Sequence, residues 1–170
     1  MNQAATETSK DRQGGRGRRH TFARGGGQRQ YDHEVLDVAR VVRVVKGGRR
    51  FRFRASVIVG DRSGSVGFGI GKSRDVQQAI QKAQDQATKN LVKINLKDDT
   101  IPHTVQAKYN GAVVFLKPAK PGTGVIAGGT IRIVADLCGI KNLVSKALGS
   151  SNRASNARAT IKALQSIIKK

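Results

Sequence analysis

A dense group of basic side chains lies in the first half of the chain. Between Arg40 and Arg54 there are seven Lys or Arg residues and no Asp or Glu: Arg40, Arg43, Lys46, Arg49, Arg50, Arg52 and Arg54. Guanidinium and ammonium groups bind phosphate, whereas a merely solvated face usually mixes charges of both signs. The pattern therefore favours a polyanion, and above all a nucleic acid, over the alternative of a solvent-exposed face.

The rest of the chain carries the same sign of charge. The 170 residues contain 32 Lys or Arg and 11 Asp or Glu, which gives a net charge of +21. Residues 101–170 alone have eleven Lys or Arg against one acid, Asp136. We therefore expect contact with a polyanion to extend over the whole chain.

Residues suited to catalysis or metal binding are scarce. The single cysteine, Cys138, excludes an internal disulfide and a cysteine metal cluster, and His20, His33 and His103 lack ligand spacing. No carboxylate pair suggests acid-base chemistry after position 99. We expect a protein without catalytic residues, metal or cofactor, in which Cys138 is a buried structural thiol.

Two glycine motifs resemble nucleotide-binding loops. A Walker A loop ending at Gly71-Lys72-Ser73 needs a glycine at position 66, which is Val66. Gly122-x-Gly124 fits a dinucleotide motif, but it follows a Pro-containing loop, and position 142 is Asn where an acid is expected. We predict instead that Lys120, Gly122 and Gly124 contact RNA. A nucleotide-dependent enzyme remains an alternative that ATP or NAD binding would reveal.

Three segments position these residues. Residues 1–31 form a Gly/Arg-rich arm that lacks the apolar surface to fold alone. Residues 32–97 predict three antiparallel strands and a helix capped by Ser73, with Asp75 in its first turn. The strand FRFRASVIV alternates, which predicts Phe51 and Phe53 in the core, with Arg52 and Arg54 on a basic outer face.

Residues 98–170 predict a second α/β unit. Asn110-Gly111 marks a hairpin, and a final amphipathic helix begins after Ser151 or Asn152. The segment 140–148 fits a strand or a helix, and the order is read as β-β-α-β-α. The charge is densest on a β-hairpin, not on a helix, which favours structured RNA over DNA.

A succession of motifs identifies a family. In order stand KGGRRFRF, VIVGDRSGSVGFGIGK, a helix containing AIQKA, KPGTGVIAGG, and LGSSN with RAT. This order resembles the fifth protein of the bacterial-type small ribosomal subunit over roughly residues 34–168. The resemblance implies an α+β fold: a double-stranded-RNA-binding-like β-β-β-α domain, followed by an α/β domain with a left-handed β-α-β crossover.

The resemblance also implies a role and partners. It implies a non-enzymatic, cytoplasmic ribosomal protein that binds small-subunit (16S-type) rRNA and contacts the fourth and eighth small-subunit proteins. Family members stabilise the head relative to the body, line the messenger RNA entry path and contribute to accuracy. Lys46, Gly47, Gly48 and Arg49 fall in the family's RNA-reaching hairpin loop, and Arg40 and Lys72 at its basic positions. We expect no membrane and no homo-oligomer, and keep a free RNA chaperone as the alternative.

Overall fold

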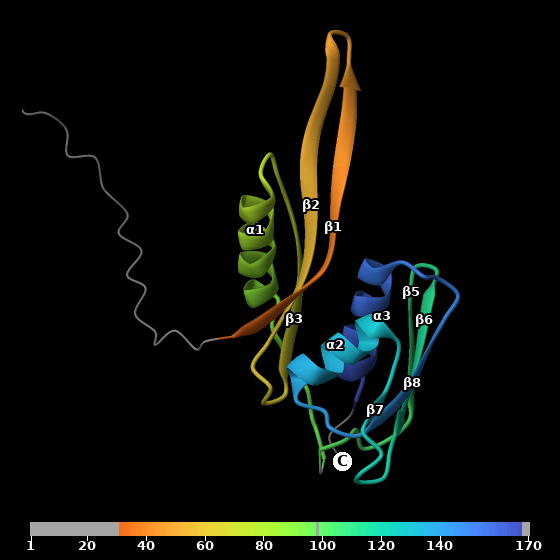
Figure 1. Ribbon diagram of the computed structural model, residues 1–170. Coiled ribbons are helices and arrows are strands. Elements are labelled where there is room, and N and C mark those ends of the chain that lie inside the picture. The colour runs from red at the N-terminus through yellow and green to blue at the C-terminus, as the bar shows by residue number, and fades with distance from the viewer. Residues whose placement is uncertain (1–30, 98, 168–170) are drawn as a thin grey trace, which may run out of the picture.

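The computed structural model describes residues 31–97 and 99–167. They form two four-stranded sheets and three helices, which confirms the predicted α+β class (Figure 1). The predicted arm lies, apart from Tyr31, outside the described residues. Within the described part, none of the helices has the length and apolar character that a membrane span requires.

The first sheet is antiparallel and carries one helix. Its elements, in chain order, are β1 (Asp32–Val45), β2 (Gly48–Gly60), β3 (Ser65–Ser73), α1 (Val76–Lys89) and β4 (Val92–Lys93). The strands lie in the order β1-β2-β3-β4, and α1 packs on one face. The predicted β-β-β-α order is confirmed, and the two-residue β4 adds an edge that the sequence analysis did not anticipate.

Helix α1 lies directly on strand β3 because both contribute their smallest residues to the contact. Three alanines of α1 are fully buried, namely Ala79, Ala83 and Ala87. They face three glycines of β3, at positions 67, 69 and 71. A Cβ atom added to Gly69 would lie 2.1 Å from the carbonyl oxygen of Ala83. These glycines are therefore strand residues whose missing side chains allow the helix to approach.

The start of α1 differs from the prediction. Ser73 still belongs to β3, and its hydroxyl donates to Oε1 of Gln78 at 2.9 Å. Asp75 is the N-cap, without a side-chain capping bond, instead of a first-turn residue. The predicted Ser73 cap is wrong because β3 continues through Ser73.

The second sheet contains one parallel pair. Its elements are β5 (Val105–Tyr109), β6 (Ala112–Pro118), β7 (Val125–Ile126), α2 (Gly129–Cys138), β8 (Leu143–Leu148) and α3 (Arg153–Gln165). The strands lie in the order β5-β6-β8-β7, with β7 and β8 parallel and joined through α2. The ambiguous segment is strand β8, and the predicted β-β-α-β-α order lacked the short β7. The hand of this crossover stays an expectation.

The helix caps of this unit follow ordinary rules. The side chain of Asn152 accepts hydrogen bonds from the amides of Ala154 and Ser155, which settles the N-cap of α3.

The thiol of Cys138 is fully buried, and burial, with a smaller effect of the Asp61 carboxylate, raises its pKa to about 12. Cys138 is therefore the structural residue that was predicted.

The two sheets share one hydrophobic core. Leu36, Ile58, Val66 and Phe68 of the first sheet pack with buried residues of α2, α3 and the second sheet. Ser56 lies on the same face of β2 as Arg52 and Arg54, which the alternation had predicted to be exposed, but it is only 2% exposed because the second unit covers it. Residues 55–60 of β2 are thus buried on both faces, so the predicted outer face is exposed only nearer the hairpin tip.

Backbone contacts close the seam between the units. In the β2–β3 turn, the amides of Arg62 and Gly64 donate to the carbonyl oxygens of Leu137 and Cys138, at 3.0 and 2.9 Å. Gly139 has a φ of 87°, and a Cβ there would lie 2.2 Å from the carbonyl oxygen of Arg62. Only glycine fits where two backbones approach this closely.

The same turn contains a carboxylate, Asp61, that should make the stability of the fold depend on pH. One oxygen of Asp61 accepts the amides of Ser63 and Ser65, both at 2.8 Å. Partial burial alone would raise the pKa of Asp61, but these hydrogen bonds outweigh it and hold the pKa below the ordinary 3.8. A carboxyl with a lowered folded pKa stabilises the fold above its unfolded pKa, and this contribution is lost as the pH falls through the folded value.

We expect the Asp61→Asn substitution to reduce this acid sensitivity. Its amide oxygen can still accept both bonds, so the turn is kept while the titration is removed. Urea unfolding from pH 7 down through 3.8 should give a shallower fall in stability for the variant than for the unmodified chain. Identical pH profiles for the two proteins would contradict the assigned role of Asp61.

Candidate nucleic-acid interface

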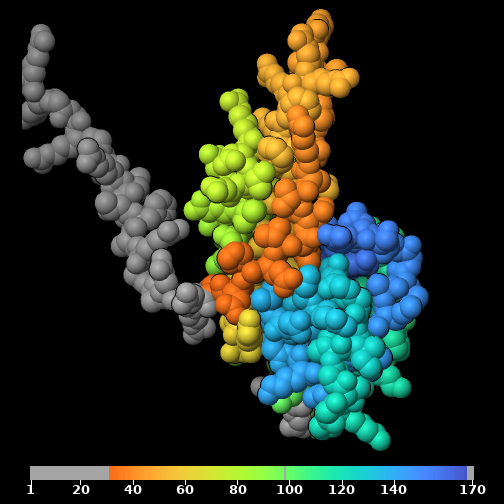
Figure 2. Space-filling model, in the orientation of Figure 1, coloured from red at the N-terminus to blue at the C-terminus, as the bar shows by residue number. Residues whose placement is uncertain are grey.

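The upper part of the β1–β2 hairpin projects beyond the body of the protein (Figures 1 and 2). Helix α1 has 14 residues, a length of about 21 Å, whereas the 13 residues of β2 span about 44 Å. The helix can therefore cover only part of the strand. The remainder, approximately residues 40–52, presents both of its faces to solvent.

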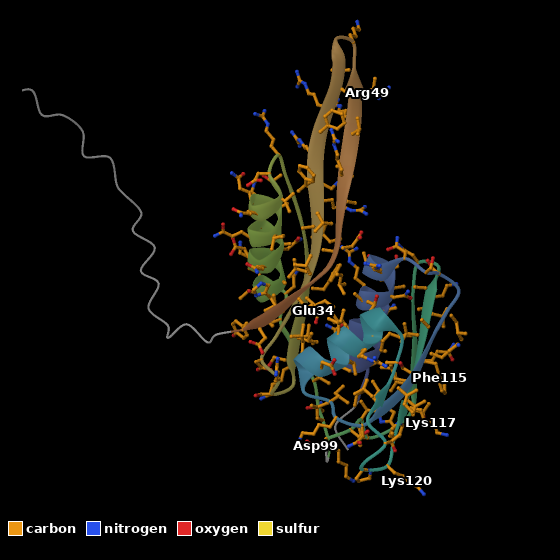
Figure 3. The ribbon with its side chains drawn as sticks, in the orientation of Figure 1. Glu34, Arg49, Asp99, Phe115, Lys117 and Lys120 are labelled. Atoms are coloured by element: carbon orange, nitrogen blue, oxygen red, sulfur yellow. The ribbon has the colours of Figure 1, made fainter. Side chains whose placement is uncertain are left out.

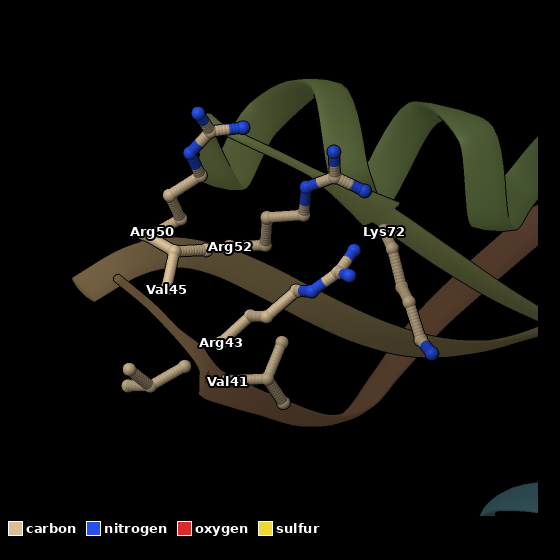
Figure 4. Close-up of a pocket in the computed structure, with 7 residues that line it drawn as sticks. Val41, Arg43, Val45, Arg50, Arg52 and Lys72 are labelled. Atoms are coloured by element: carbon tan, nitrogen blue, oxygen red, sulfur yellow. The ribbon is translucent and has the colours of Figure 1, made fainter. Parts of the chain in front are cut away.

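One face of the hairpin is a basic groove. We use this name for Arg43, Arg50, Arg52 and Lys72, which surround an opening of about 360 Å³ with Val41 and Val45 in its lining. Figure 4 shows the three guanidinium groups and the Lys72 ammonium gathered on this side of the sheet. Residues from three strands thus meet, and the sequence-predicted Lys72 joins the cluster from β3.

The strand register places like charges opposite each other in this region. Arg43 pairs with Arg50 across β1 and β2, and Arg54 pairs with Lys72 across β2 and β3. Like charges in directly opposite positions destabilise a sheet. Within residues 31–97 and 99–167 the ion pairs are Arg62–Asp32 and Lys141–Asp99, so no carboxylate compensates the groove. A bound polyanion would supply that compensation.

The tip of the hairpin extends this charge. Lys46 lies in the turn and Arg49 directly follows Gly48 in β2, and Arg49 lies at the far end of the hairpin in Figure 3. Gly48 has a φ of 141°, a backbone conformation that L side chains rarely adopt, and Gly47 has open space around it. The turn can therefore approach another backbone closely.

The other face of the hairpin corrects an assignment. Phe51, predicted to be buried, is 43% exposed, and the guanidinium of Arg40 lies 3.7 Å from its ring centroid. Phe53 does pack against the core beneath α1. The alternation was interpreted correctly, but α1 begins at Val76, just after Ser73 opposite Phe53, and therefore does not extend as far as Phe51.

The predicted loop site lies elsewhere. Lys120 is exposed at the end of the molecule opposite Arg49 (Figure 3), so the structure does not bring the two predicted groups together. The amides of Gly122 and Gly124 both donate to Oδ1 of Asn142 at 3.1 Å. These two amides are therefore already hydrogen-bonded within the protein. An RNA backbone could still approach the two glycines closely, and the exposed Lys120 could bind a phosphate.

A third basic surface was missed by the sequence analysis. Alternate residues of β5 and β6, together with Lys146 of β8, are exposed on one face of the second sheet, and none of them is acidic: Gln106, Lys108, Phe115, Lys117 and Lys146. Phe115 pairs with Lys146 across β6 and β8, and it projects on the same side as Lys117 (Figure 3). The period-two spacing of Phe115 and Lys117 was the available signal.

Other arginines have structural contacts. Arg153 donates to the carbonyl oxygen of Leu36 at 2.9 Å and joins α3 to β1. Arg158 donates to the Tyr109 hydroxyl at 2.6 Å, and its guanidinium lies 5.3 Å from the Phe68 ring centroid.

In the described part of the chain, no three His, Cys, Asp or Glu side chains are grouped to hold a metal.

Comparisons with known proteins assign a family to this arrangement. Two family models match, "Ribosomal protein S5, N-terminal domain" over residues 31–95 and "Ribosomal protein S5, C-terminal domain" over residues 107–169. Proteins called "Small ribosomal subunit protein uS5" from Campylobacter jejuni strains 81-176 and RM1221 are each 54% identical over 135 residues. Those alignments cover 79% of this chain and 92% of each relative. The chain belongs to the ribosomal protein S5 family and is a non-enzymatic, cytoplasmic ribosomal protein, as its motifs had implied.

Proposed function

We propose that the chain binds 16S-type rRNA in the small ribosomal subunit, through the basic groove and the hairpin tip. The observation that carries the proposal is the acid-free groove, in which Arg43 and Arg50 are paired in register. Phosphates of folded RNA would neutralise this charge, and displacement of their counterions would favour binding. The family membership makes the chain a structural component of the ribosome and supports this choice of polyanion.

Finer roles follow as part of the same proposal. Units 32–97 and 98–170 would hold separate RNA segments, because the hairpin tip and Lys120 lie at opposite ends of the molecule (Figure 3). Such a two-ended contact would stabilise the head relative to the body, line the messenger RNA entry path and so influence accuracy. The fourth and eighth small-subunit proteins would be its neighbours.

A paired substitution tests the RNA contacts. We expect Arg49→Ala with Arg50→Ala to weaken binding to transcribed 16S-type rRNA and to lower the salt dependence of log K by about 1.4 to 1.8, because each lost phosphate contact removes about 0.7 to 0.9 counterions. Filter binding over a range of salt concentrations measures this slope. Lys89→Ala, on α1 away from the hairpin, is the control. A double variant with an unchanged slope would refute these contacts.

Sedimentation separates a ribosomal component from a free RNA chaperone. A native lysate is centrifuged at moderate and then at high salt, and the chain is followed against small-subunit RNA. Stoichiometric co-migration that persists at high salt is expected for an integral component. Release into the light fractions would indicate a chaperone that binds many RNAs.

A further inference from the structure

We propose that Arg40 and Phe51 form a stacking platform for an unpaired RNA base, on the hairpin face opposite the basic groove. The inference rests on the proposed RNA function and adds a second mode of recognition to it. The hairpin would then bind RNA phosphates on one face and stack against an unpaired base on the other.

The first observation is an apolar strip that no part of the described chain covers. Val38, Val42, Val44 and Phe51 lie on one face of β1 and β2 and are 42%, 49%, 74% and 43% exposed. Isolated exposed apolar residues are ordinary, but a contiguous group on a projecting element indicates a binding surface. In Figure 2 the upper part of the hairpin stands clear of the rest of the described surface.

The second observation is the geometry of the aromatic pair. The guanidinium of Arg40 lies 3.7 Å from the Phe51 ring centroid, well inside the distance of about 6 Å for a cation–π contact. The contact holds a planar guanidinium against the ring. Both groups, an aromatic ring and a guanidinium plane, are the surfaces on which proteins stack unpaired RNA bases.

Charge decides which occupant fits the strip. Arg40 and Arg49 flank it, and no acid occurs between positions 40 and 54. A nucleotide satisfies both features, because its base is flat and apolar on its faces while its phosphate is anionic. Paired bases in an A-form helix are stacked on each other, so only an unpaired or splayed base can reach the platform. A protein partner would need an apolar surface with an acidic rim and is the competing occupant.

The absence of tryptophan from the sequence makes a direct test possible. Phe51→Trp introduces a single indole at the platform, and a short oligoadenylate should quench its fluorescence by stacking. An abasic oligonucleotide of equal length and charge should bind without quenching. Gln81→Trp, on the exposed side of α1, is the control in which neither oligonucleotide should quench.

Affinity gives an independent reading. Phe51→Leu should weaken oligoadenylate binding by about 5- to 150-fold, the range for one base–aromatic contact, while Phe51→Tyr should retain it. The salt slope and the affinity for the abasic oligonucleotide should stay unchanged, unlike in the Arg49 and Arg50 variants. Oligoadenylate that binds without quenching the indole at position 51, and with equal affinity for Phe51→Leu, would overturn the platform and leave the proposed function intact. Failure of the unmodified chain to bind either oligonucleotide or 16S-type rRNA would overturn both.

Discussion

Arg50→Glu is expected to make the free protein more stable and its complex with RNA weaker. In the sheet, Arg50 lies directly opposite Arg43, so the substitution replaces a repulsive pair with an attractive one. Cross-strand charge pairs contribute roughly 0.2 to 1 kcal/mol, and both partners are exposed, so a rise in Tm of about 1 to 4 °C is expected. RNA affinity should fall by at least about tenfold at low salt, because a phosphate contact becomes a repulsion.

Arg49→Glu is the matched control for this prediction. Arg49 is the neighbouring residue and makes the same change of charge, but it lies opposite Val44 instead of a cation. It should weaken RNA binding without raising Tm. Thermal unfolding and filter binding on both variants provide the comparison. A Tm for Arg50→Glu no higher than that of Arg49→Glu would show that the Arg43–Arg50 repulsion is not present in solution.

Gly69→Ala is expected to cost about 3 kcal/mol of folding free energy or more, at the upper end of the range for overpacking. The added methyl carbon would lie 2.1 Å from the carbonyl oxygen of Ala83 and 2.6 Å from the amide nitrogen of Ala87. Both are backbone atoms of α1, so no side chain can rotate aside and the whole helix must move. Because total stabilities of such proteins are about 5 to 15 kcal/mol, this is a large fraction.

The control for this prediction is Gly47→Ala at the hairpin tip. No heavy atom lies within 4 Å of a Cβ at Gly47, and its φ is not positive. Gly47→Ala should change the free energy of unfolding by no more than about 1 kcal/mol. The change should be stabilising, because alanine lowers the conformational entropy of the unfolded chain. Urea unfolding of the two variants measures the difference. Equal midpoints would mean that α1 does not lie against β3 as closely as the structure places it.

Local patterns determined the elements of this protein. Alternation fixed the faces of β2, Asn110-Gly111 fixed the turn between β5 and β6, and the Asn152 cap fixed the start of α3. The concentration of unmixed positive charge between positions 40 and 54 was also visible without coordinates, and so were the motifs that carry the family resemblance. These features depend on neighbouring residues, which a single sequence displays directly.

Pairings between distant segments were only partly accessible. The glycines of β3 recur every second residue and the alanines of α1 every fourth, which are the repeats of a strand and a helix. That correspondence could have predicted their contact. The bond from the Gly122 amide to Asn142 could not, because it joins positions 20 residues apart through a turn that no local pattern specifies.

The tertiary structure alone decided what covers each face. Alternation predicts that Phe51 and Ser56 point to opposite faces of β2, but it does not show how deeply either face is buried. Phe51 is exposed because α1 is about half as long as β2, and Ser56 is buried because the second unit packs on its side. The sequence thus determined a basic hairpin and two α/β units, while the relative lengths and docking of the elements decided that its upper part stands free on both faces.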